Sequence, residues 1–345
     1  MSELVQTFAP GRVNLIGDHT DTTGGLALPM AIDLGTTILA RRGHDRVVLA
    51  STDEEGVAEV ALDADDPASA MPAWARYVAG VIAELRPDDG FVGEVRTTIP
   101  LGRGLSSSAA LEAAVALTLL GPDAAATIDR LALAQSLQRA EQRASGVPCG
   151  VMDQLTSLCG QAGHALLLDC TTLQVSPIEL PAHAEVVVID SGERRELRTS
   201  PYAERRAELA EAEATIGPLR DATLSDVEAL PDRGPRHRAR HVVTENARVR
   251  AFSLALLAED LPAAGALMRH SHASLSDDFE CSTATVDALV DRLNRTRGVH
   301  GARITGAGWG GCVVALTDPG ALQEGYLVRA SGGATCDRAA APSSR

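Results

Sequence analysis

Lysine is absent from this sequence of 345 residues, so all 31 of its Lys and Arg residues are arginine. The chain therefore has no Gly-Lys-Ser or Gly-Lys-Thr of a Walker loop. It also lacks the lysine that P-loop enzymes and protein kinases place on the phosphates of a nucleotide. Any cation that acts on a phosphate in this protein must be an arginine or a metal ion.

Positive charge is scarce in other respects too. The 46 Asp and Glu residues give a formal net charge of −15 and a pI near 5.0. This balance argues against a nucleic-acid partner, although local arginines and backbone dipoles can still bind a nucleotide. We see no apolar run near the length of a membrane span and no basic-then-apolar leader after Met1. We therefore expect no membrane partner and a cytoplasmic location.

Cysteine is infrequent, and its spacing excludes two further classes of site. None of the six cysteines forms a C-x-x-C pair or follows a metal-finger spacing, so we expect reduced, mostly buried thiols. They are Cys149, Cys159, Cys170, Cys281, Cys312 and Cys336. The length of the chain predicts two domains, with a change of composition at residues 180–186 as the best boundary.

The most informative segment that is present runs from Pro100 to Leu111. A β-branched stretch over residues 93–99 precedes it, and an Ala- and Leu-rich helix is predicted over residues 109–119. Glycines that permit a tight turn and hydroxyls at a helix start are typical of a phosphate-binding loop, whose residues here are Gly102, Gly104, Leu105, Ser106, Ser107 and Ser108. A serine that merely caps the helix is the simpler alternative.

Three other segments carry polar groups that chemistry could use. Asp18, His19 and Asp21 follow a predicted strand, Glu141 and Asp153 lie at the end and start of neighbouring helices, and residues 306–311 form a glycine-rich turn. Each has a structural alternative when taken alone: an Asx turn, a solvated or capping carboxylate, and a plain hairpin. Their joint occurrence favours a functional site.

In order and spacing, these segments resemble the three signature motifs of the GHMP small-molecule kinases. The motifs are Gly11-Arg12-Val13-Asn14-Leu15-Ile16-Gly17 with His19-Thr20-Asp21, Pro100 to Leu111, and Gly306 to Cys312. Within that family the chain is most similar to the galactokinases. The resemblance implies an α+β fold with an N-terminal domain like the second domain of ribosomal protein S5 over residues 1–182. A ferredoxin-like domain would follow over residues 183–330, then a flexible tail over 331–345, with the site between the domains.

The resemblance also implies an ATP- and Mg²⁺-dependent transfer of the γ-phosphoryl group to a monosaccharide hydroxyl, with D-galactose converted to galactose 1-phosphate as the leading candidate. Asp153 resembles the catalytic aspartate, Arg12 the arginine beside it, and Ser107 and Glu141 the magnesium ligands. Trp74 resembles an aromatic on the adenine side. The sugar-binding positions are Asp18, His19, Asp21, Gly150 and Tyr202.

Several positions depart from the galactokinase pattern and leave the sugar open. Galactokinases usually have Glu at position 18, Tyr-Asn at positions 22 and 23, His at 195 and Tyr at 279, where this chain has Asp18, Thr22, Thr23, Arg195 and Phe279. An amino sugar, a pentose, a cyclitol or a cyclitol phosphate is therefore an alternative acceptor. A non-catalytic sensor is the remote alternative, which the complete set of Arg12, Ser107, Glu141 and Asp153 opposes. We expect a monomer or a weak dimer.

Overall fold

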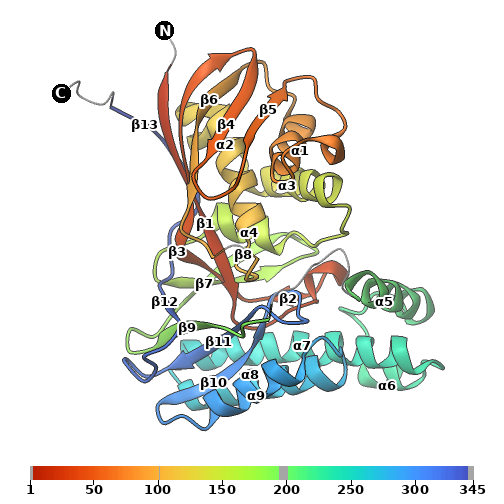
Figure 1. Cartoon of the computed structure of the whole chain (residues 1–345). Helices are drawn as coiled ribbons and strands as arrows, with labels where there is room; N and C mark the ends of the chain where they lie inside the picture. The colour runs from red at the N-terminus through yellow and green to blue at the C-terminus, as the bar shows by residue number, and fades with distance from the viewer. Residues whose placement is uncertain (1–2, 101, 194–200, 341–345) are drawn as a thin grey trace.

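The computed structural model describes residues 3–100, 102–193 and 201–340, and a six-stranded sheet dominates its N-terminal half (Figure 1). The strand order is β13-β1-β3-β6-β4-β5, and helices α1 to α4 cover one face. The strands are β1 Leu4–Asn14, β3 Pro29–His44, β4 Arg46–Ser51, β5 Val57–Ala61, β6 Gly90–Thr97 and β13 Thr335–Arg338. The helices are α1 Ala75–Leu85, α2 Ser107–Thr127, α3 Arg130–Ser145 and α4 Met152–Cys159.

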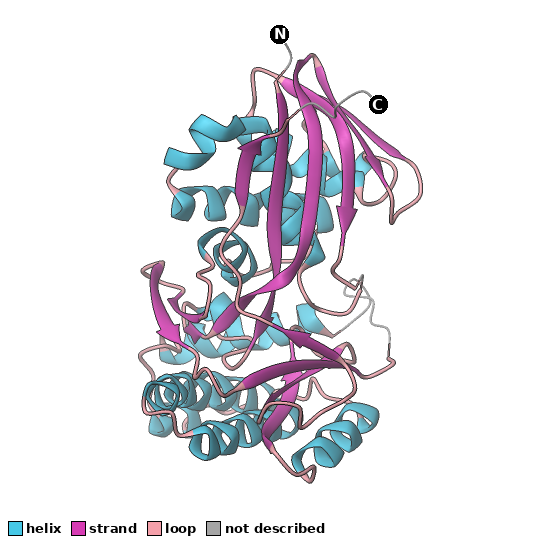
Figure 2. Cartoon of the chain, turned by 90° about the vertical axis from the view of Figure 1, so that its left-hand side faces the viewer, coloured by secondary structure: helices cyan, strands magenta, loops and turns pink. Residues whose placement is uncertain are grey.

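A four-stranded sheet with order β10-β11-β9-β12 forms the other half together with helices α5 to α9 (Figure 2). Its strands are β9 Glu185–Asp190, β10 Val299–Thr305, β11 Cys312–Thr317 and β12 Tyr326–Val328. The helices are α5 Tyr202–Ile216, α6 Leu224–Glu228, α7 Arg233–Leu257, α8 Leu261–Asp277 and α9 Ala284–Asn294. The small sheet β2-β7-β8 lies between the halves, with strands Leu26–Ala27, His164–Asp169 and Gln174–Glu179. The α+β class predicted from the sequence is thus observed.

The tail prediction is wrong for the residues nearest the second domain. Residues 335–338 form β13, which pairs antiparallel with β1, and Ala334 and Cys336 are buried. The strand covers the edge of β1, which would otherwise expose a row of unpaired backbone groups. Residues 341–345 lie outside the described part of the chain.

Two helix predictions also need correction. The sequence predicts one helix over residues 124–145, but the chain leaves the helical conformation at Ile128, and Asp129 then caps α3. The sequence predicts a polar segment over residues 231–240 and a helix from about His241, but α7 already begins at Arg233. Arg238 is buried there and donates hydrogen bonds to Glu208 and Glu280, so a polar sequence forms a packed helix.

Helix α2 has the length and apolar character of a membrane span, which the sequence reading had not expected. Of its most apolar 18-residue window, 67% is buried inside the protein. The helix packs on β1, β3 and β13. Its apolar surface is therefore used in the core of the N-terminal half.

Candidate active site

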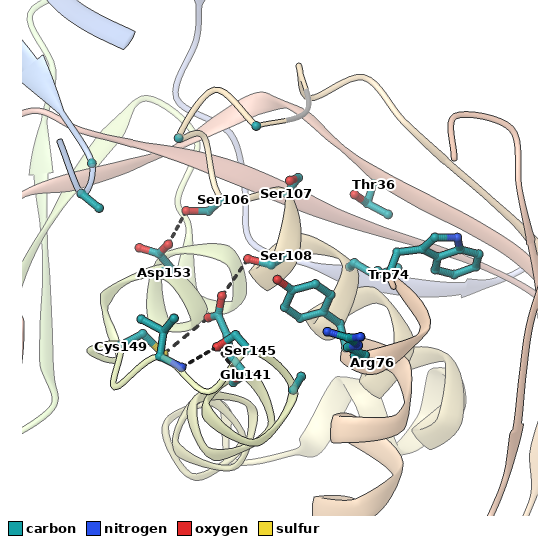
Figure 3. A pocket seen from close by; sticks show the side chains of 18 of the residues that line it. Thr36, Trp74, Arg76, Ser106, Ser107, Ser108, Glu141, Ser145, Cys149 and Asp153 are labelled. Atoms are coloured by element: carbon teal, nitrogen blue, oxygen red, sulfur yellow. Dashed lines mark hydrogen bonds between the residues drawn. The ribbon is translucent and has the colours of Figure 1, made fainter. Parts of the chain in front are cut away.

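A cavity of about 880 Å³ is lined by residues of both halves, from the serine loop, α1 and the start of α4 to Tyr202 and the turn at Gly306. Figure 3 shows its polar side chains converging from α2, α3 and α4. The segments that the sequence reading singled out separately thus meet at one place.

The serines after the glycine turn face this cavity instead of capping the helix. Ser106 is the N-cap of α2 and has a left-handed φ of 60°, but its side chain makes no cap bond. Its hydroxyl donates to Asp153 Oδ2, and the Ser108 hydroxyl donates to Glu141 Oε1 at 2.8 Å (Figure 3). Ser107 lines the cavity between them. The geometry therefore disfavours the simple-cap alternative.

One residue expected in this loop has a different place. The Leu105 side chain is buried in the hydrophobic core, and among the described residues it is not part of the cavity lining. Its carbonyl oxygen accepts a hydrogen bond from the Arg12 backbone N–H at 3.1 Å. Leu105 thus anchors the loop to β1 and does not itself face a ligand.

A bidentate ion pair joins Arg12 to Asp153. Arg12 Nε lies 2.8 Å from Asp153 Oδ1 and Nη2 lies 2.7 Å from Oδ2, while Nη1 donates to the Gly104 carbonyl oxygen at 2.7 Å. Such a fork holds the carboxylate in one orientation at the cavity wall. The same guanidinium fixes the serine loop relative to the carboxylate, so one arginine positions both parts.

Glu141 belongs to a buried group of carboxylates that local spacing could not reveal. Burial, followed by the charge of Asp153, raises the pKa of Glu141. Burial and then the charge of Glu141 raise the pKa of Glu112 well above its usual value. Gln154 Nε2 donates to Glu141 Oε2 at 2.6 Å. Glu112 and Gln154 were not assigned from the sequence; a carboxylate inside an Ala- and Leu-rich helix was the available signal for Glu112.

These residues suit a divalent cation that is shared with a phosphate ligand better than a metal ion held by protein side chains alone. No cluster of three or more His, Cys, Asp or Glu residues is arranged around a common point in the described chain. Mg²⁺ is usually held by one or two carboxylates together with phosphate oxygens and water. Glu141 and Ser107 supply oxygens of that kind. A cation there would offset the burial and the repulsion by Asp153 that raise the pKa of Glu141.

The loop after β1 is held by helix α7 from the other half of the chain. Glu245 accepts from the Gly17 N–H at 3.0 Å, His241 Nε2 lies 3.1 Å from the Asp18 carbonyl oxygen, and Asn246 accepts from the Leu26 N–H at 2.8 Å. Burial alone would raise the pKa of Glu245, but the charges of His241, Arg248 and Arg303 outweigh burial and lower it to about 2. An ionised Glu245 is therefore a permanent acceptor for the loop.

Asp18 lines the cavity, but both of its carboxylate oxygens already have partners. Oδ2 accepts from Arg303 Nη2 at 2.5 Å, and Oδ1 accepts from the Gly306 N–H at 3.0 Å. The side chains are only 3% and 0% exposed for Asp18 and Arg303. Arg303 was missed from the sequence, where an arginine within an otherwise apolar strand was the signal. The pair ties the glycine-rich turn to the loop after β1.

The Asp21 carboxylate lies so close to Gly150 that it occupies the space where a side chain at position 150 would begin. A Cβ on Gly150 would lie 1.8 Å from Asp21 Oδ2, so only glycine leaves room for this carboxylate. Burial, with the charge of Asp153 next, raises the pKa of Asp21 to about 6. His19 stacks on Phe279 with ring centroids 4.0 Å apart and has Tyr202 5.9 Å away. The predicted sugar-binding side chains thus lie together, with Phe279 behind His19.

The remaining departures lie elsewhere. The Thr23 hydroxyl donates to the Thr20 carbonyl oxygen, and neither Thr22 nor Thr23 is among the described residues that line the cavity. Arg195 falls outside the described residues.

Trp74 lines the cavity on the side of α1, and its Nε1 donates to the Glu55 carbonyl oxygen at 3.2 Å.

The raised pKa of Asp21 predicts a stability that depends on pH. Asp21 binds a proton more tightly in the folded protein than in the unfolded chain, so its ionisation destabilises the fold as pH rises from about 4 to about 6. We expect Asp21→Asn to raise the free energy of unfolding at pH 7.5 by on the order of 2–3 kcal/mol, with the difference vanishing below pH 4. Urea denaturation of the ligand-free protein at several pH values measures it.

Asp169→Asn is the control of opposite sign, because hydrogen bonds from Arg220 lower the pKa of Asp169. That substitution should destabilise the protein at neutral pH and matter less in acid. A neutral or negative effect of Asp21→Asn at pH 7.5 would show that the Asp21 carboxylate is stabilised where it lies.

Comparison with known proteins gives a consistent set of matches. Residues 2–42 match the galactokinase galactose-binding signature, residues 76–161 the GHMP kinases N-terminal domain, and residues 253–329 the GHMP kinases C-terminal domain. The chain is 42% identical to a galactokinase of Homo sapiens, over 92% of this chain and 86% of that protein. It is 40% identical to a galactokinase of Chloroflexus aurantiacus, over 93% and 87%.

A solved structure is similar over nearly the whole length. Lactococcus lactis galactokinase, solved in complex with galactose, superposes with a TM-score of 0.88 at 34% identity and covers 96% of this chain and 95% of that one. A mevalonate kinase from Methanococcus jannaschii superposes with a TM-score of 0.66 at 21% identity, over 92% and 91%. The second likeness concerns the fold alone.

Proposed function

The chain belongs to the galactokinases of the GHMP kinase family, and from this membership we propose how its own residues carry the reaction. It is an ATP-dependent phosphotransferase that converts galactose to galactose 1-phosphate. The departures from the usual pattern do not remove it from the family. The single observation that carries the proposal is the meeting of Asp153, Arg12 and the serine loop at one cavity.

The ATP phosphates bind against residues 102–108, where the turn and the start of α2 offer backbone donors and hydroxyls. Ser107 and Glu141 would hold Mg²⁺, which when bound would offset the charge of the phosphates. Trp74 lies on the adenine side of the cavity.

Asp153 receives the proton of the attacking hydroxyl or orients that hydroxyl, because its carboxylate faces the cavity in a fixed position. Arg12 holds that carboxylate in one orientation and offsets negative charge that builds on the transferring group. His19, Asp21, Gly150 and Tyr202 bind the sugar. Asp18 acts there indirectly, by fixing the loop that carries His19 and Asp21.

The domain limits also remain proposals: an N-terminal domain over residues 1–182 and a C-terminal domain over 183–330, the latter followed by β13, which joins the first sheet. We place the protein in the cytoplasm as a soluble monomer or weak dimer. Burial of α2 in the core supports the solubility.

Release of ADP over a panel of acceptors tests this function. We expect turnover with galactose to exceed that with galactosamine, arabinose and inositol, since the family assignment rests on a galactose-binding signature. EDTA should stop the reaction and added Mg²⁺ should restore it. Phosphorus NMR of the product identifies the ester. A pentose or cyclitol that is turned over faster than galactose would replace galactose as the substrate and leave the kinase chemistry standing.

A further inference from the structure

Arg76 is a cavity-lining cation for which the described part of the chain supplies no partner. It is the second residue of α1, and its Nε is buried with no hydrogen-bond partner among the described residues. No ion pair or hydrogen bond of its guanidinium occurs within the described chain. A buried polar atom left unpaired costs free energy, so such a group is typical of a site that a ligand completes.

The charge of the cavity makes this arginine conspicuous. The described lining residues include two arginines and seven carboxylates, Asp18, Asp21, Asp53, Glu54, Glu55, Glu141 and Asp153. Each of the three guanidinium nitrogens of Arg12 donates a hydrogen bond, two of them to Asp153 and one to the Gly104 carbonyl oxygen. Arg76 is therefore the uncommitted cation of the described lining.

The position of Arg76 indicates which part of a ligand it meets. Trp74, Arg76 and Tyr77 come from one helical turn and present three flat groups to the cavity. Figure 3 places Trp74 and Arg76 on one side of the cavity and Asp153 on the opposite side, with the serines between. In the proposed function the phosphates bind at the serines and the sugar binds near Asp153. The side of the cavity with Trp74 and Arg76 is then left for the purine base.

We propose that Arg76 binds the purine base of the nucleotide, with its planar guanidinium stacking on the ring and donating to ring nitrogens. Guanidinium groups stack on aromatic faces and donate in a fixed plane, which a lysine ammonium does not. The proposal rests on the use of ATP set out above.

Binding of ADP and of adenosine to three variants tests this, measured by calorimetry on the whole protein. We expect Arg76→Gln to weaken both ligands by the same factor of about five to ten. Arg76→Lys should behave within about twofold of Arg76→Gln, because the charge remains and the plane is lost. The KM for galactose should stay unchanged. Arg250→Gln is the matched control, since Arg250 is exposed on α7.

Each other outcome overturns the proposal in a recognisable way. If Arg76→Gln weakens ADP but leaves adenosine unaffected, the contact is to phosphate. If Arg76→Lys binds both ADP and adenosine as tightly as the wild-type protein does, the positive charge at position 76 is sufficient and the planar guanidinium is not needed. Unchanged affinities show that Arg76 has no role in binding the nucleotide. Failure of the wild-type protein to bind ADP would instead count against the proposed function.

Discussion

Asp153→Asn is expected to lower turnover by at least about 100-fold while the affinity for ADP stays nearly unchanged. The substitution keeps the shape of the side chain but removes the charge and the proton affinity that the attacking hydroxyl needs. Asp153 faces the cavity from the start of α4 and is held by Arg12 in a bidentate pair. ADP release under saturating substrates measures turnover, and calorimetry measures nucleotide binding.

Asp88→Asn is the matched control, because Asp88 is an exposed aspartate between α1 and β6. It should leave both quantities as they are. Retention of more than about a tenth of the wild-type turnover in Asp153→Asn would show that Asp153 is not the proton acceptor. Positioning by Arg12 and the serine loop would then carry the reaction.

Asp18→Ala is expected to lower the free energy of unfolding by about 3–5 kcal/mol. The substitution leaves the guanidinium of Arg303, which is 0% exposed, without its carboxylate, and removes the acceptor of the Gly306 N–H. Nε and Nη1 of Arg303 have no hydrogen-bond partner among the described residues, so Asp18 is the side chain that pairs with this guanidinium there. Urea denaturation at constant pH measures the loss.

Two further variants separate the buried charge from the cavity left by the side chain. Asp18→Ala combined with Arg303→Met should recover part of the stability, because the unpaired charge is then gone. Asp45→Ala breaks the exposed pair with Arg46 and should leave the free energy of unfolding nearly unchanged. A double variant no more stable than Asp18→Ala alone would show that the charge of Arg303 is solvated without Asp18.

A feature of this protein is predictable from its sequence when the residues that form it are close together in the chain. The serine loop was recognisable because its glycines, serines and helix are adjacent in the chain. The break between α2 and α3 was missed because it is short: Ile128 ends α2, and Asp129 directly after it caps α3. The helical start of α7 was missed because Arg238 is stabilised by Glu208 and Glu280, which lie 30 and 42 residues away.

By itself the sequence determined the α+β class and the family, since each depends on residues close together or on motifs in fixed order. The phosphate-binding role of the serine loop stays a prediction. Only the tertiary structure decided that Asp18 is committed to Arg303, 285 residues further along, and that α7 holds the loop carrying His19 and Asp21. It also decided that residues near the C-terminus complete the first sheet. The physical reason is that hydrogen bonds and ion pairs act over a few ångströms in space, and sequence spacing does not fix which distant segments folding brings within that range.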